Sequence, residues 1–125
     1  MVLAGKKGAH TNNLLSIIMK LSKPIEMDYS KENFLVLLSY GENTEKSPYT
    51  HKQIAEWCER FWNEYCDIDA PEIIEKIMPV LADVETQWDL YLANTYSLSE
   101  LQQLDCESVC LPVEWFKNWS AEANA

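Results

Sequence analysis

Hydrophobic side chains recur at helical spacing along residues 50–66, THKQIAEWCERFWNEYC. The apolar positions of this stretch are Ile54, Trp57, Cys58, Phe61 and Tyr65. Their offsets of 3, 4, 7 and 11 from the first position define one face of a helix. Thr50 is the expected N-cap, because its hydroxyl can accept a hydrogen bond from a backbone N–H of the first turn. Since large aromatic rings crowd this face, the pattern predicts the central helix of the core.

Two earlier stretches also predict helices. Residues 12–21 carry Leu and Ile on more than one face, which indicates a well-buried helix. Residues 30–40 place one apolar face at Phe34, Leu35, Leu37 and Leu38. Ser30 or Asp28 is the candidate N-cap of this helix, and Gly41 is the candidate C-cap. The run FLVLLSY also fits a buried strand, but its length and the lack of a partner strand favour a helix.

The longest apolar pattern covers residues 71–96 and keeps helical spacing for about two dozen residues. Pro79 lies inside this pattern. A proline inside a helix removes a backbone hydrogen bond and clashes with the preceding turn. Pro79 must therefore kink or split the helix. A kink near residues 75–78 is expected, with both halves facing the same core. Asp69 is the expected cap at the start of this helix, with Pro71 in the first turn.

Two shorter helices are expected after residue 96. Ser97 and Glu100 have the spacing of a capping box and predict a short helix that ends near Leu104. Pro112 can open a last helix, whose aromatic positions are Trp115, Phe116 and Trp119.

Together these patterns predict an all-α, single-domain bundle of five or six helices, the longest of which is kinked at Pro79. The expected boundaries are a flexible tail at residues 1–11, a helical domain at 12–121 and a C-terminal tail at 122–125. The two longest helices should pack against each other through Trp57, Phe61, Leu81 and Trp88.

Charge is distributed unevenly along the chain. The net charge is −10, from 20 acidic and 10 basic residues. Residues 1–53 hold five acids and seven bases, whereas residues 54–125 hold fifteen acids and three bases. The second half should repel nucleic acid and anionic membranes and attract a basic protein surface or a cation. Arg60 is the only arginine, which disfavours a phosphate-binding role.

No segment has the length of apolar sequence that spans a bilayer. The apolar run at residues 14–19 is short and is interrupted by Lys20, which argues against a signal peptide. A cytoplasmic location is therefore expected, with the four cysteines as free thiols.

No catalytic motif is visible, so the sequence predicts a protein that is not an enzyme and needs no cofactor or metal. The spacing of Cys106 and Cys110 would suit zinc, but Cys58 and Cys66 are eight residues apart and do not complete a zinc motif. Structural thiols are favoured over a metal site or a disulfide, which remain alternatives. His51 is expected to be solvated, with its pKa lowered by the positive end of the helix dipole.

The acidic side chains form stripes on the predicted outer faces of the helices. These carboxylates suggest either a solvated surface or a docking surface for a basic partner, and the one-sided charge favours docking. Trp62 lies beside the buried stripe and is the expected anchor of such an interface. The candidate partner-binding residues are Glu56, Glu59, Trp62, Asn63, Asp67, Asp69, Glu72, Glu75 and Asp83.

In its length, its acidity and aromatic helices such as IAEWCERFWNEY, the chain resembles the small helical immunity proteins of bacterial toxin systems. The resemblance implies a non-enzymatic protein that docks on and neutralises a basic partner, such as a nuclease toxin domain. A helical adaptor or structural interaction module, whose acidity serves only solubility, is the alternative. Neither interpretation involves nucleic acid or a membrane, and the oligomeric state is left open.

Overall fold

The computed structural model describes residues 23–125, and these residues form helices and no strand. The predicted tail at 1–11 and the predicted helix at 12–21 lie outside the described residues. The elements are α2 (Lys31–Glu42), α3 (His51–Tyr65), α4 (Glu72–Glu75), α5 (Met78–Thr95), α6 (Leu98–Gln103), the short 3₁₀ helix η1 (Cys106–Ser108) and α7 (Val113–Asn124). The all-α class predicted from the hydrophobic pattern is confirmed.

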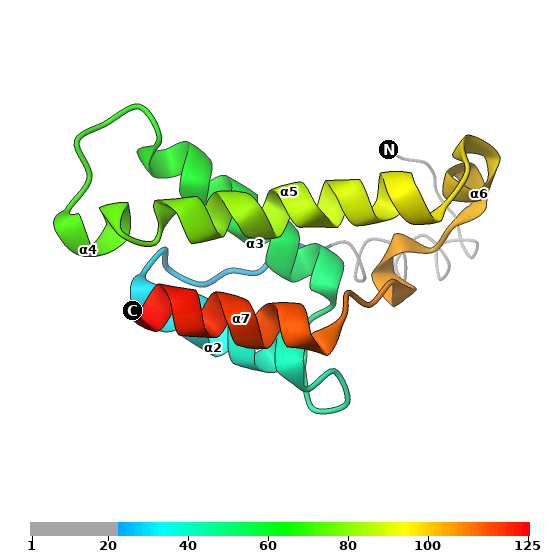
Figure 1. The fold of residues 1–125 in the computed structure, drawn as a ribbon, viewed down its shortest axis with the longest axis horizontal. Coiled ribbons are helices and arrows are strands. Elements are labelled where there is room, and N and C mark those ends of the chain that lie inside the picture. Colours follow the sequence, from blue (N-terminus) through cyan, green and yellow to red (C-terminus); the bar gives the residue numbers. More distant parts are fainter. Residues whose placement is uncertain (1–22) are drawn as a thin grey trace, which may run out of the picture.

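Two helix pairs make up the bundle. Helix α3 packs across α5, and α2 packs beside α7, as Figure 1 shows. Further contacts of α2 with α3 and of α5 with α7 join the pairs around one core. The four residues expected to join the two longest helices are all buried: Trp57, Phe61, Leu81 and Trp88.

The segment before α2 runs along α3 and is tied to it by side-chain hydrogen bonds. Gln53 Nε2 donates to Lys23 O at 2.7 Å, Trp57 Nε1 to Met27 O at 3.1 Å, and Arg60 Nη2 to Ile25 O at 3.2 Å. Gln53, Trp57 and Arg60 are four and three residues apart, so they lie on one side of the helix. This contact was not predicted, because a segment without regular structure has no hydrophobic period to read.

The predicted caps at the starts of three helices are confirmed. Thr50 forms a capping box with Gln53, and Ser97 forms one with Glu100. Ser30 caps α2 by accepting from the Asn33 backbone N–H at 3.1 Å. The expected cap at Asp69 is wrong, because α4 begins after Pro71 and has no side-chain cap.

Pro79 separates two helices instead of kinking one. Helix α4 ends at Glu75, and α5 starts at Met78 with Ile77 as its N-cap. At the break, Ile77 N–H bonds back only three residues, to Ile74 O at 3.0 Å. Because proline has no N–H, placing it in the first turn of a new helix leaves no donor missing. The sequence located the irregularity and left a split helix open, although a kink was expected.

Gly41 is not the left-handed C-cap that the sequence predicted. It lies inside α2, which continues to Glu42 and is capped by Asn43. A Cβ atom at this position would overlap the ring of Phe116 on α7. Glycine is therefore needed here for the close approach of two helices.

The predicted C-terminal tail at residues 122–125 is also wrong. Helix α7 continues to Asn124, and the Ala123 side chain is buried against the core. Ala123 lies four residues after Trp119 and seven after Phe116, so it extends their buried face by one turn. The small side chain gave too weak a signal for this extension to be read from the sequence.

Candidate functional site

The candidate partner-binding residues lie mostly on the surface, but they do not form one continuous stripe. Glu56, Trp62 and Asp83 are half-buried. The exposed ones are Glu59, Asn63, Asp67, Asp69, Glu72 and Glu75. Asp67 and Asp69 lie in the connection after α3, and Glu72 and Glu75 lie in α4. The structure therefore divides the predicted set among α3, the loop with α4, and the far side of α5.

A cluster of carboxylates lies between α3 and α5. Glu56 and Glu59 on α3 and Glu85 and Asp89 on α5 line a shallow groove of about 100 Å³, together with Ala55 and Trp88. We call these four carboxylates the acidic groove. Burial raises the pKa of Glu85, and the negative charges of Glu59 and Asp89 raise it further. The charges of Glu59 and Asp89 thus lie close enough to disfavour the ionised form of Glu85.

Glu85 and Asp89 were missed by the sequence analysis. Each follows a buried α5 residue, Val84 or Trp88, by one position, and the two are one helical turn apart. That regularity was available in the sequence. Which side of α5 faces the acids of α3, however, depends on how the two helices cross.

Asp83 points away from the acidic groove. Its Oδ2 accepts a hydrogen bond from Trp119 Nε1 on α7 at 2.8 Å, and its Oδ1 accepts one from Gln87 Nε2 at 3.4 Å. Positions 83 and 85 differ by about 200° around a helix, which places their side chains on opposite sides. Asp83 therefore belongs to the surface between α5 and α7.

Few basic groups neutralise the acidic groove among residues 23–125. Lys52 Nζ lies 3.1 Å from Glu56 Oε2 and 3.6 Å from Glu107 Oε1. Glu107, a residue the sequence analysis did not select, also accepts from Thr50 Oγ1 at 2.7 Å and so joins η1 to the start of α3. No Lys or Arg of the described part forms an ion pair with Glu59, Glu85 or Asp89.

His51 is buried, contrary to the expectation that it is solvated. Its Nδ1 accepts from the Leu111 backbone N–H at 2.8 Å, and its Nε2 lies 3.1 Å from Gly41 O. This arrangement fits a neutral ring that carries its proton on Nε2. Burial lowers the pKa of His51, while the hydrogen bond to Gly41 opposes that shift. The ring joins three segments of the fold and has no exposed face with which to act as a base.

Because the pKa of His51 is lowered in the folded state, acid should destabilise the fold through this residue. A histidine in the unfolded chain has a pKa near 6.5. The contribution of His51 to the free energy of unfolding is therefore complete above about pH 6.5, and it is lost as the pH falls toward the pKa of His51 in the folded state. We expect wild-type stability, measured by urea unfolding, to fall relative to that of His51→Gln between about pH 6.5 and 5. An NMR titration of the His51 ring should give a pKa below the usual value. Parallel stability curves for the two proteins would contradict this assignment.

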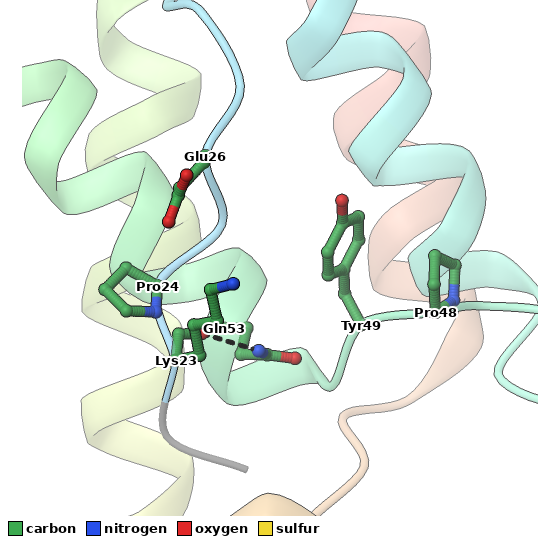
Figure 2. A pocket seen from close by; sticks show the side chains of 6 residues that line it. All are labelled: Lys23, Pro24, Glu26, Pro48, Tyr49 and Gln53. Atoms are coloured by element: carbon green, nitrogen blue, oxygen red, sulfur yellow. Dashed lines mark hydrogen bonds between the residues drawn. The ribbon is translucent and has the colours of Figure 1, made fainter. Parts of the chain in front are cut away.

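A second cavity, shown in Figure 2, lies where the segment before α2 meets the start of α3. It has a volume of about 300 Å³ and is lined by Lys23, Pro24, Glu26, Pro48, Tyr49 and Gln53. The hydrogen bond between these residues, from Gln53 Nε2 to Lys23 O, holds the chain segment in place. The cavity contains no nucleophile paired with a base, so its chemistry does not indicate catalysis.

The cysteines and other ligand-type residues show no metal-binding arrangement within residues 23–125, where no group of three or more His, Cys, Asp or Glu is placed to hold an ion. All four cysteines are free thiols. Cys58 is fully buried in the aromatic face of α3, as predicted. None of the helices in this described range is both long and apolar enough to cross a membrane.

The fold and surface define a small helical bundle with a strongly acidic groove between its two longest helices. Comparisons with protein families, with curated proteins and with solved structures find no match to this chain. Its function must therefore be inferred from its own surface.

Proposed function

We propose that this chain is a non-enzymatic binding protein that docks on a basic protein through its acidic helical surface and neutralises it. An immunity protein that blocks a nuclease toxin acts in this way. The observation that supports the proposal most is the acidic groove, where Glu59, Glu85 and Asp89 lie together without an ion-pair partner among the described residues. Such a cluster of like charges opposes folding, and a basic partner would relieve the repulsion.

The contacts that the basic side chains make within the fold support the same proposal. The guanidinium of Arg60 donates to Ile25 O, and Lys52 bridges Glu56 and Glu107. Lys76 pairs with Glu72 on an exposed turn, where an ion pair adds little to stability. These three bases therefore make local contacts, and none of them pairs with Glu59, Glu85 or Asp89.

Apolar side chains beside the acids could form the dry centre of an interface. Ile68 is 60% exposed and Ile73 is 52% exposed, and both lie among the acidic residues between the end of α3 and α4. Trp62 is half-buried on the last turns of α3. Apolar anchors surrounded by charged groups are the usual composition of a specific interface.

We infer a cytoplasmic location, where four free thiols remain reduced.

Affinity capture with a matched charge control tests this proposal. One variant replaces the acidic groove by neutral residues: Glu56→Gln, Glu59→Gln, Glu85→Gln and Asp89→Asn. The control removes the same charge from exposed sites elsewhere: Glu26→Gln, Glu32→Gln, Glu45→Gln and Glu114→Gln. From a lysate of the source cells, the wild type and the control should retain a basic protein that the groove variant does not.

The captured protein is then purified and assayed for its own activity, with nuclease activity tested first. The chain should inhibit that activity at equimolar concentration, and the groove variant should not. Equal capture by all three proteins would contradict the proposal and would favour a helical adaptor whose acidity serves solubility. A captured partner whose activity is unaffected would exclude neutralisation.

A further inference from the structure

A cavity of about 340 Å³ lies between α5 and α7, on the side of α5 opposite the acidic groove. Its lining residues are Asp83, Gln87, Trp115, Asn118, Trp119 and Glu122. A neighbouring cavity shares Asp83 and Glu122, so the depression continues toward the start of α5. Its volume lies at the lower end of the range of small-ligand sites, which runs from about 300 to 1,000 Å³, and it is open to solvent. We call it the α5–α7 cavity.

The carboxylate of Asp83 is held in a fixed position in this cavity. Trp119, whose side chain is buried, donates its indole N–H to Oδ2 at 2.8 Å, and Gln87 donates to Oδ1 at 3.4 Å. Both donors are neutral, so they orient the carboxylate without cancelling its charge. Glu122 adds a second carboxylate, and no Lys or Arg lines the cavity. The cavity is therefore suited to a cation.

Aromatic rings form part of the wall. The centroids of Trp115 and Trp119 lie 6.2 Å apart with planes at 70°, which makes a corner. Tyr91 on α5 packs edge-on against Trp115, with ring centroids 5.9 Å apart and ring planes at 88°. Tryptophan is the best aromatic partner for a cation, and a guanidinium also stacks flat on such a ring. Two carboxylates and the side-chain oxygens of Gln87 and Asn118 provide acceptors for several N–H groups.

From this geometry we propose that the α5–α7 cavity binds the guanidinium of an arginine side chain presented by the basic partner. The planar guanidinium stacks on the Trp115 indole, and its N–H groups donate to Asp83 and Glu122. A lysine ammonium is a compact point charge and would use the flat aromatic wall less fully. This inference rests on the proposed function, because it takes the arginine from the same partner. It adds a second contact on the other side of α5.

The binding of a small arginine probe tests the cavity without the partner. N-acetyl-L-arginine methylamide is titrated into the full chain while the indole N–H signals of Trp115 and Trp119 are followed by NMR. The matched probe is the citrulline analogue, which has nearly the same shape and no charge. We expect saturable shifts of these two signals with arginine, at millimolar concentration, and none with citrulline.

Glu122→Gln should weaken arginine binding by about fivefold or more, since a charge-assisted hydrogen bond is lost. Glu122 is exposed, so this variant should keep the fold. Trp115→Leu should weaken binding by a similar factor through loss of the stacking surface. Glu114→Gln on α7 and Asp89→Asn in the acidic groove remove the same charge outside the cavity and should bind arginine as the wild type does.

Equal shifts with arginine and citrulline, or wild-type affinity in both Glu122→Gln and Trp115→Leu, would overturn the assignment. Tighter binding of the corresponding lysine probe would overturn the preference for guanidinium. The two proposals can also fail separately. If the groove variant loses the captured partner while Glu122→Gln and Trp115→Leu retain full affinity for it, docking stands and the cavity assignment fails. If the cavity binds arginine but no basic partner is captured, the proposed function fails.

Discussion

Replacing Trp57 by alanine should lower the free energy of unfolding by about 3–5 kcal/mol, the largest effect expected of any single substitution here. The side chain is fully buried. Its ring packs against three other aromatic rings. The distances between ring centroids are 5.5 Å to Tyr29, 5.3 Å to Phe61 and 6.4 Å to Phe34. Its indole N–H also holds the segment before α2 through Met27 O. Alanine would leave a cavity and an unpaired Met27 carbonyl. The expected decrease is a large part of the free energy of unfolding of a typical domain, which is about 5–15 kcal/mol.

Urea unfolding followed by circular dichroism measures this effect. Trp62→Ala on the same helix is the control and should cost about 1 kcal/mol, because its side chain is only half-buried. Trp57→Phe separates the two causes: it keeps most of the packing and removes the hydrogen bond to Met27. An unchanged unfolding midpoint in Trp57→Ala would show that α3 is not the centre of the core.

Reversing charge in the acidic groove should slow association with the purified partner by about two orders of magnitude. At low salt, attraction between complementary surfaces raises the association rate constant to about 10⁸ M⁻¹s⁻¹ or more. Without such attraction it is about 10⁵–10⁶ M⁻¹s⁻¹. Glu59→Lys with Asp89→Lys changes two exposed residues that have no ion pair among the described residues. Dissociation should change less, because it depends on the desolvated centre of the interface.

Stopped-flow rates over a salt series measure this second effect. Raising salt to about 1 M shortens the Debye length to about 3 Å, which should slow wild-type association steeply. Glu32→Lys with Glu114→Lys gives the same change in charge at exposed sites outside the groove and should slow association far less. An association rate independent of salt, with the groove reversals neutral, would show that the acids form only a solvated surface.

The sequence predicted two of the four carboxylates of the acidic groove. Glu56 and Glu59 could be placed on the outer side of α3, because helical spacing alone separates them from Trp57 and Phe61. Their counterparts Glu85 and Asp89 could not be selected. The sequence analysis selected Asp83 for the same docking surface as Glu72 and Glu75. The break before Met78 separates it from them, and Asp83 accepts a hydrogen bond from Trp119 on α7 instead. The direction in which a second helix approaches is not encoded in a helical period.

Two misplaced residues have the same origin. His51 and Gly41 were interpreted by their positions at helix ends, which usually indicate a solvated side chain and a left-handed cap. Both instead lie against Phe116 of α7, and His51 also accepts from Leu111. These partners are more than 50 residues away along the chain, so no local rule could supply them.

The sequence by itself determined the helical class, the buried faces of α3, α5 and α7, the N-cap at Thr50, the capping box at Ser97, and the excess of negative charge. The charge follows from composition alone. The faces and caps depend on side chains a few residues apart, whose relative positions the backbone geometry of a helix fixes. Only the tertiary structure decided which acids meet across α3 and α5, and which carboxylate enters the α5–α7 cavity. Those neighbours are set by the angle and register at which the helices pack, and these result from the fit of the whole core.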